Sequence, residues 1–470
     1  MSNPASMLDN MTAISDYIAN DRANIFAQLK ELVSFNSVHN EPGLEEEAQK
    51  AAQWVEKTLT DAGVKVEAVN TADGSTALVG KRAGKEGAKT VLLYSHYDVV
   101  PVGPRESWES DPLTLTERTA PSGDTRWYGR GAADCKGNIA MHLAALRAID
   151  ANGGTDLNLT FLIEGSEERG GEGLSALIEE RPELFAADAI LIADAGNAKA
   201  GQPTLTTSLR GGAQIYVQVD TLESGVHSGQ FGGAAPDAVK ALMRALDSLS
   251  DEHGRTTIDG VDCAGTWPLA EGQTTAYKPE DFRTDAQMLE GTEIMGSQDP
   301  AGATEIADMI WARPAVTVTG FTSTPVAEAV NAVPATAAAK LNLRTPATMD
   351  PRATAEAVAE HLKNHVPWGA HIKVDILEAN RGFETDPAKP AAALLGECLA
   401  EAYGTATSSQ GMGGSIPLTV ELQEKHPNAE IALFGVEDPQ ATIHSANESV
   451  DPNEIEKIAT AEAYFLQRFA

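Results

Sequence analysis

Short apolar runs alternate with amphipathic segments in the first part of the chain, and this alternation is typical of an α/β domain. Strands are predicted at 64–69, 76–79, 91–98, 157–163 and 189–193, and helices before residue 35, over 45–58 and from Asp134 onward. Strands that are buried on both faces read as continuous apolar runs, so the pattern predicts a mixed, largely parallel sheet. Ligands bind at the carboxyl ends of such strands.

The pattern changes near Leu209 and returns near Asp386. Between these points, alternating strands at 215–219, 341–344 and 371–377 and amphipathic helices at 236–249 and 350–363 predict an α+β two-layer sandwich. Residues 251–314 are polar and weakly periodic, which predicts an elaborated loop region. We therefore predict a discontinuous catalytic domain, residues 1–208 and 386–470, with an inserted domain at 209–385. A strand at 430–434 belongs to the second part of the catalytic domain.

Composition limits the partners that the chain can have. The 470 residues carry a net charge of −33, which argues against nucleic acid and anionic membranes and is best explained as a solvated acidic surface. The chain has no apolar run long enough for a membrane span and no basic leader before an apolar core, so we expect a cytoplasmic protein. The three widely spaced cysteines, Cys135, Cys263 and Cys398, are expected to be reduced thiols.

Five possible metal ligands stand at loop positions that follow predicted strands: His96, Asp134, Glu168, Asp194 and His444. Imidazoles and carboxylates without cysteine suit Zn²⁺, Mn²⁺ or Co²⁺ in an open catalytic site. Five side chains are too many for one tetrahedral ion, but they suit two ions that share a bridging carboxylate. The chain therefore predicts two divalent metal ions, with zinc preferred.

Two acidic residues beside these ligands have predicted roles of their own. Asp98 follows His96 in an H-x-D pair, and a carboxylate there can orient a metal-bound imidazole through its other nitrogen, although a single such pair is also typical of an ordinary core or surface histidine. Glu167 is adjacent to Glu168, so one carboxylate can bind metal while the other accepts a proton from water. A solvated helix start is the alternative explanation of the Glu-Glu pair.

Four motifs together resemble the M20 family of co-catalytic zinc peptidases, and within it the carnosinase-like dipeptidases. They are SHYDVVPV at 95–102, YGRGAADCKG at 128–137, EGSEE at 164–168 and HSGQFGG at 227–233. The resemblance runs from about residue 20 to the C-terminus. It implies a zinc-peptidase α/β domain with an inserted lid and dimerisation domain, and therefore a homodimer.

The resemblance also implies a role for each site residue. Asp134 would bridge both ions, His96 and Asp194 would bind the first, and Glu168 and His444 the second. Asp98 would orient His96, and Glu167 would be the general base. His227 would stabilise the oxyanion in the partner subunit's site, Arg344 would hold the substrate's terminal carboxylate, and Gly413, Gly414 and Ser415 would form the loop along the substrate backbone.

The chain departs from this family at two places. Cys135 stands where Asp or Asn is more common, and the alternatives for its thiol are an extra ligand, an oxidation site or an inert neighbour of the metals. Gly411-Met412 stands where the carnosinase-like branch usually has Arg-Glu, which affects the prediction of substrate preference.

The function predicted from the sequence is a two-metal hydrolase that cleaves the amide bond of dipeptides or similar small peptides. An N-acyl-amino-acid deacylase or desuccinylase would use the same metal centre. A non-catalytic binding protein on this scaffold is the alternative of another class, and the complete set of ligands and base argues against it.

Overall fold

The computed structural model describes residues 4–268, 278–300, 302–414 and 416–469. The chain divides into two compact units: unit 1 comprises residues 1–207, 385–410 and 417–470, and unit 2 comprises 208–384 and 411–416. The sequence pattern placed 411–416 in the catalytic domain. They group with unit 2 because the Arg210 backbone N–H donates to the Met412 carbonyl at 3.0 Å and because Gly411 packs against Trp311.

A nine-stranded mixed sheet forms the centre of unit 1, in the order β1-β2-β6-β3-β7-β17-β8-β15, with β16 also paired to β8. The central strands β6, β3, β7 and β17 are parallel, and the flanking strands are antiparallel, so the predicted mixed, largely parallel sheet is confirmed. The bounds are β1 Lys65–Asn70, β2 Thr76–Arg82, β3 Thr90–His96, β6 Asn158–Glu164, β7 Ala189–Ala193, β8 Thr204–Leu209, β15 Phe383–Glu384, β16 Ser408–Met412 and β17 Glu430–Phe434.

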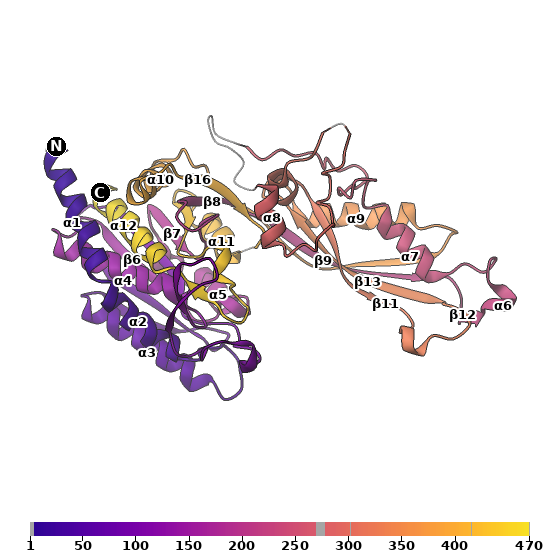
Figure 1. Ribbon diagram of the computed structural model, residues 1–470, viewed down its shortest axis with the longest axis horizontal. Coiled ribbons are helices and arrows are strands. Elements are labelled where there is room, and N and C mark those ends of the chain that lie inside the picture. The colour runs from indigo at the N-terminus through magenta and orange to yellow at the C-terminus, as the bar shows by residue number, and fades with distance from the viewer. Residues whose placement is uncertain (1–3, 269–277, 301, 415, 470) are drawn as a thin grey trace. The chain divides into compact units, whose positions relative to one another are not determined.

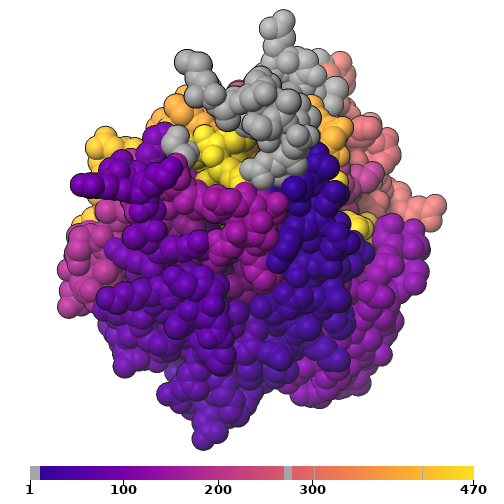
Figure 2. Space-filling model, turned by 90° about the vertical axis from the view of Figure 1, so that its left-hand side faces the viewer, coloured from indigo at the N-terminus to yellow at the C-terminus, as the bar shows by residue number. Residues whose placement is uncertain are grey.

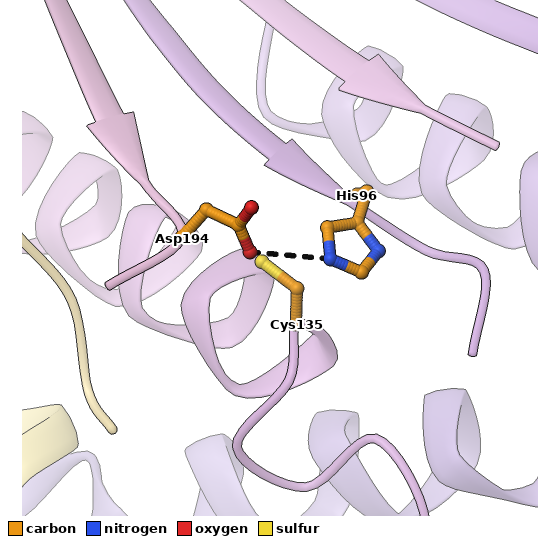
Figure 3. A group of neighbouring side chains, drawn as sticks. All are labelled: His96, Cys135 and Asp194. Carbon is orange, nitrogen blue, oxygen red and sulfur yellow. Dashed lines mark ion pairs between the residues drawn. The ribbon is translucent and has the colours of Figure 1, made fainter. Parts of the chain in front are cut away.

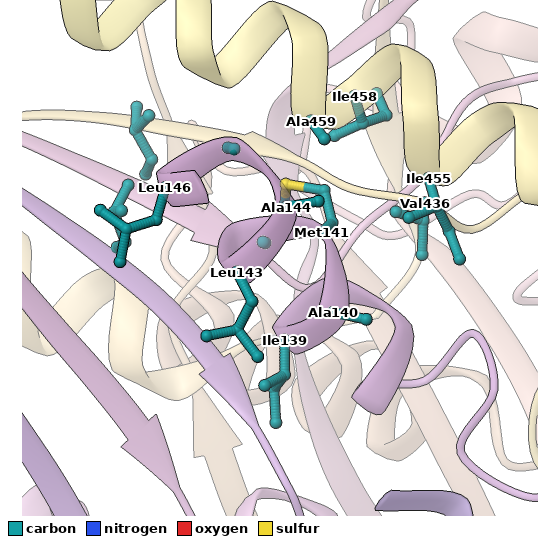
Figure 4. Close-up of a cluster of buried hydrophobic side chains, with 14 of the residues drawn as sticks. Ile139, Ala140, Met141, Leu143, Ala144, Leu146, Val436, Ile455, Ile458 and Ala459 are labelled. Carbon is teal, nitrogen blue, oxygen red and sulfur yellow. The ribbon is translucent and has the colours of Figure 1, made fainter. Parts of the chain in front are cut away.

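The helices of unit 1 pack around this sheet, with α4 buried along almost its whole length between β3 and α12 (Figure 4). Side chains such as Leu143 and Ile458 fill that layer. The bounds are α1 Pro4–Asn20, α2 Arg22–Ser34, α3 Glu45–Asp61, α4 Lys136–Ala151, α5 Glu172–Glu180, α10 Pro390–Tyr403, α11 Pro417–Lys425 and α12 Pro452–Arg468. Short 3-10 helices cover Arg105–Ser107, Glu167–Arg169, Pro182–Phe185 and Pro439–Ala441.

Several predicted helix boundaries in unit 1 are wrong. The helix predicted before residue 35 is present as α2 and is preceded by a separate helix, α1, with a break at Asp21, and the helix predicted from Asp134 begins at Lys136. The C-terminal helix α12 was not predicted at all. Figure 2 shows the indigo N-terminal and yellow C-terminal segments on the same face of unit 1, where the Tyr464 hydroxyl donates to the Met11 carbonyl at 2.9 Å.

A small antiparallel sheet, β18-β5-β4, accompanies the large one in unit 1. Its strands are β4 Thr116–Thr119, β5 Thr125–Tyr128 and β18 Ser449–Val450. Because Ser449 pairs with Tyr128, this sheet brings the chain just after His444 next to the chain just before Asp134. Two of the candidate ligand loops are therefore held together by strand pairing.

Unit 2 is a four-stranded antiparallel sheet, β11-β13-β9-β14, whose one face is covered by α7 and α9 (Figure 1). Every second residue of β9 is buried, as the predicted two-layer sandwich requires. Asp237 and Asp350 cap the two helices, so Pro236 precedes α7 and does not belong to its first turn. The bounds are β9 Gly211–Asp220, β11 Ala315–Thr322, β13 Thr336–Thr345, β14 His371–Asn380, α7 Ala238–Asp247 and α9 Pro351–His365.

The remaining elements of unit 2 are short. They are β10 Val226–His227, β12 Ala332–Val333, α6 Ser228–Phe231, α8 Pro279–Asp285, a 3-10 helix at Val326–Glu328 and a π-helix at Asp308–Ala312. The described parts of 251–314 thus form loops with two short helices, as the weak periodicity predicted. Of the helices described in either unit, none combines the length and the apolar character that crossing a membrane would require.

Candidate metal centre

Two predicted ligands stand at the carboxyl ends of neighbouring parallel strands. His96 is the last residue of β3, and Asp194 follows the last residue of β7. Because β3 and β7 pair in parallel, their ends meet at one edge of the sheet. Figure 3 shows the two side chains facing each other, with 3.2 Å between His96 Nε2 and Asp194 Oδ1.

The carboxylate of Asp134 lies between two imidazoles. Its Oδ1 is 3.1 Å from His96 Nε2, and its Oδ2 is 3.0 Å from His444 Nε2. Glu168 Oε2 is also 3.0 Å from His444 Nε2. The structure therefore brings all five predicted ligands together as two groups that share Asp134: His96 with Asp194, and His444 with Glu168.

The charges in this cluster suit cations. Burial raises the pKa of Asp194 and of Glu168, whereas the hydrogen bonds from His444 and His96 outweigh burial and hold the pKa of Asp134 below its usual value. Glu168 Oε1 is buried without a partner, and one N–H of His96 cannot serve Asp134 and Asp194 at once. Divalent cations would satisfy these carboxylate oxygens, so the donor set fits the metal ions that the sequence predicted.

Asp98 is fully buried and holds two parts of the site. His96 Nδ1 lies 3.2 Å from Asp98 Oδ1 and 3.0 Å from the Asp98 carbonyl oxygen, so the ring orientation is fixed from behind. The same carboxylate accepts the backbone N–H groups of Glu167 and Glu168 at 3.1 and 3.0 Å. The sequence predicted the first contact but not the second.

Glu167 is the predicted general base, and its side chain is 21% exposed. Its Oε2 lies 3.8 Å from His96 Nε2, so the carboxylate borders the ligand cluster. Burial raises its pKa well above the usual range, and the negative charge of Asp194 adds to this shift. A carboxylate with raised basicity beside the ligands is suited to proton transfer.

Two further acidic residues of the site were not predicted. Glu448 is buried and accepts from Arg130 Nη1 at 2.7 Å and from the backbone N–H groups of Gly131, Ala133 and Asp134 at 3.0, 3.1 and 3.1 Å. It therefore holds the loop that carries the shared carboxylate. Its position four residues after His444 was the only sequence signal.

Glu437 offers a carboxylate oxygen within 4.8 Å of ligand atoms of Asp134 and Asp194. Burial and these two neighbouring carboxylates raise its pKa well above the usual range. The signal that could have found it is its place: it follows β17, a parallel strand that ends at the same edge of the sheet.

The thiol of Cys135 points toward the gap between His96 and Asp194 (Figure 3). Its Sγ lies 3.1 Å from the Ala193 carbonyl oxygen and donates to it. Burial raises the pKa of this thiol well above its usual value, which favours the protonated form where no cation is bound.

The other predicted site residues belong to unit 2, whereas all the ligands belong to unit 1. His227 is exposed at the start of α6, and its Nδ1 accepts the Gly229 backbone N–H at 3.1 Å. Arg344 lies on β13 and is partly exposed, and Gly413 and Gly414 are exposed. Ser415 lies outside the described residues. The roles of these residues stay predictions.

Comparison with known proteins extends over nearly the whole chain. The model of peptidase family M20/M25/M40 matches residues 92–468. The chain is 52% identical over 448 residues to the cysteinylglycine-S-conjugate dipeptidase of Corynebacterium striatum, covering 95% of both proteins. It is 26% identical over 510 residues to the human Beta-Ala-His dipeptidase, covering 99% of this chain and 93% of that protein.

A solved structure agrees with the fold. Human carnosine dipeptidase 1 superposes with a TM-score of 0.74 at 23% identity, covering 97% of this chain and 98% of the other. The α/β fold with an additional antiparallel sheet is therefore shared with that enzyme, and the resemblance seen in the sequence motifs is confirmed. The chain belongs to peptidase family M20/M25/M40 and is a metallodipeptidase, a metal-dependent enzyme that hydrolyses dipeptides.

Proposed function

We propose that the chain binds two divalent metal ions, preferably zinc, and uses them to cleave dipeptides of the Cys-Gly type. The carrying observation is the arrangement of Asp134, whose two oxygens face different histidines at 3.1 and 3.0 Å. His96 and Asp194 would hold one ion, and Glu168 and His444 the other, with Asp134 shared. Imidazole and carboxylate ligands with a free thiol nearby favour zinc over calcium or magnesium.

The ions, when bound, supply Lewis-acid activation of water and of the scissile carbonyl. Glu167 takes a proton from the attacking water and returns it to the leaving amine, a role that its raised basicity and its position beside His96 support. Asp98 positions Glu167 by accepting its backbone N–H and positions His96 through the ring nitrogen away from the ligands. One buried carboxylate thus aligns the base and a ligand.

The substrate class is supported by the names of the relatives. The protein at 52% identity is a cysteinylglycine-S-conjugate dipeptidase, and a relative in Schizosaccharomyces pombe at 26% identity is a Cys-Gly metallodipeptidase. We propose Cys-Gly and its S-substituted forms as substrates. Arg344 would hold the terminal carboxylate, because its planar fork suits bidentate recognition, and the segment that includes Gly413 and Gly414 would lie along the substrate backbone.

The proposed assembly is a homodimer in the cytoplasm. His227 would stabilise the oxyanion in the partner's site, a role supported by its exposure and by its place in a unit that holds none of the ligands. The three cysteines are free, which supports a reducing compartment.

A pair of variants tests this proposal. Glu167→Gln keeps the shape of the base and removes its basicity, so metal content should stay near two ions per chain while turnover of Cys-Gly falls about 10²–10⁴-fold. Asp134→Ala should lose metal as well as turnover, since both ions would lose a ligand. Elemental analysis and a Cys-Gly assay with added Zn²⁺, Mn²⁺ or Co²⁺ measure both effects.

Glu179→Gln, at an exposed glutamate paired with Lys425, is the matched control and should change neither quantity. Full activity of Glu167→Gln would refute the role of Glu167 as general base. Two tightly held ions in Asp134→Ala would refute the role of Asp134 as the ligand shared by both ions. If the enzyme cleaves N-acyl amino acids and does not cleave Cys-Gly, the proposed substrate class is wrong and the deacylase alternative is favoured.

A further inference from the structure

Three side chains of unit 2 form a second cluster of possible metal ligands, separate from the centre in unit 1. His361 and His365 are four positions apart on α9, so their side chains lie on the same face of this helix. Asp259 belongs to the segment between α7 and α8 and reaches both rings. One possible ligand atom from each of the three residues lies within 4.8 Å of the other two.

Both imidazoles face the carboxylate of Asp259. Its Oδ1 lies 3.3 Å from His361 Nδ1, and its Oδ2 lies 2.9 Å from His365 Nε2. The two rings stack with their centroids 4.1 Å apart. The centre in unit 1 has the same arrangement, since the two oxygens of Asp134 lie 3.1 and 3.0 Å from two histidines. The second cluster therefore resembles the first in both residue types and spacing.

The tautomer of His361 leaves the nitrogen that faces Asp259 without a proton. The Asp259 backbone N–H donates to His361 Nδ1 at 3.0 Å, so the ring proton is on Nε2, which donates to the Ser248 carbonyl at 3.1 Å. Metal-binding histidines typically donate their second ring N–H to such a carbonyl. Burial and the neighbouring His365 lower the pKa of His361, which favours the neutral form that binds metal.

A metal ion at this cluster would replace one hydrogen bond, the one from the Asp259 N–H to His361 Nδ1. Asp259 is exposed, so water can accept this N–H instead, and such an exchange changes stability little. The side chains of His365 and Asp259 are 41% and 54% exposed. An ion can therefore enter from solvent and keep a water molecule as its fourth ligand.

We infer that Asp259, His361 and His365 bind one further divalent metal ion, with zinc preferred. Two imidazoles and one carboxylate suit zinc, whereas calcium and magnesium prefer oxygen ligands alone. The ion would tie the segment at Asp259, near the start of the elaborated 251–314 region, to α9. This inference does not depend on the proposed function, because its three ligands all belong to unit 2.

The test is elemental analysis of the full chain after equilibrium dialysis against micromolar zinc. The wild type should hold one zinc ion more than the pair proposed for unit 1. His365→Ala and Asp259→Ala should each lose that one ion and leave dipeptide turnover unchanged. His371→Ala removes an exposed histidine of β14 outside the cluster and should lose no zinc. His361 is kept, because it is buried and its replacement would also affect folding.

A second measurement isolates the cluster from the centre in unit 1. Asp134→Ala is expected to lose metal from unit 1, so calorimetric titration of this variant with zinc should still show one site, which the added His365→Ala change removes. Circular dichroism verifies that each variant is folded. If the wild type, His365→Ala and Asp259→Ala hold equal amounts of zinc, the cluster is only an ion pair and the inference is wrong, while the proposed function stands. If Asp134→Ala still loses one ion on His365→Ala but keeps the pair in unit 1, the proposed bridge is wrong and the inference stands.

Discussion

Replacing Glu448 by Gln should weaken both the fold of unit 1 and its hold on metal. One carboxylate oxygen accepts the N–H groups of Ala133 and Asp134, and the other accepts Gly131 N–H and Arg130 Nη1. An amide has a single oxygen, so either orientation turns an NH₂ group toward two donors. Breaking a buried ion pair by removing one charge typically costs about 3–5 kcal/mol, and both partners here are at most 2% exposed.

The measurement is urea unfolding of the metal-free chain followed by circular dichroism, together with a zinc titration by calorimetry. We expect a free energy of unfolding lower by about 3 kcal/mol or more, and a zinc affinity lower by about 10–100-fold because the loop before Asp134 is no longer fixed. Glu67→Gln, which removes an exposed partner of Arg181, should change neither measurement. Unchanged zinc affinity in a destabilised Glu448→Gln would show that the loop is held by other contacts.

Three further outcomes test separate parts of the molecule. Arg344→Lys should raise KM about tenfold for dipeptides with a free terminal carboxylate and leave C-terminally amidated ones unchanged, because an ammonium lacks the bidentate fork; equal KM changes for both would refute the contact. Mixing inactive His227→Ala with inactive Glu167→Gln should restore roughly a quarter of wild-type sites after subunit exchange, whereas no recovery after proven exchange would place His227 in its own chain. Burial lowers the pKa of Lys136 to about 7. Between pH 7 and 10 the unfolded chain therefore binds more protons at this group than the folded chain does. The free energy of unfolding should rise with pH in this range, by up to about 1.4 kcal/mol per pH unit from this group. Urea unfolding of Lys136→Met should lack that rise, which the exposed-site control Lys85→Met should keep; an unchanged slope in Lys136→Met would refute the shift.

The ligands at strand ends could be predicted from the sequence, because each one directly follows or closes a short apolar run that marks a buried strand. His96 closes the apolar run of β3 and Asp194 follows that of β7, and parallel strands place such ends at one edge. Asp134 lies in a loop without periodicity, so its bridging place came from resemblance alone. Glu448 was missed for the same reason: its partners lie more than 300 positions earlier in the chain, and no local pattern reports them.

The opening helix shows the same limit in the fold. The sequence predicted one helix before residue 35, where the structure has two that break at Asp21. Asp21 Oδ2 accepts Arg147 Nε of α4 at 2.9 Å, and the same guanidinium donates to Gln28 of α2 at 2.7 Å. The boundary between the two helices therefore depends on their packing against α4. This tertiary contact cannot be recognised in the local spacing of apolar residues.

Two oddities of the sequence, the elaborated region 251–314 and the departure at Gly411-Met412, are one feature in the structure. Trp311 of that region fills the space that a side chain at position 411 would need. An arginine there, as in the carnosinase-like branch, would collide with a ring that is 4% exposed and packed edge to face on Trp267. Gly411→Arg would therefore force Trp311 out of the small core that it forms with Trp267 and Ala307. The packing therefore explains why this chain carries glycine, and not arginine, at position 411.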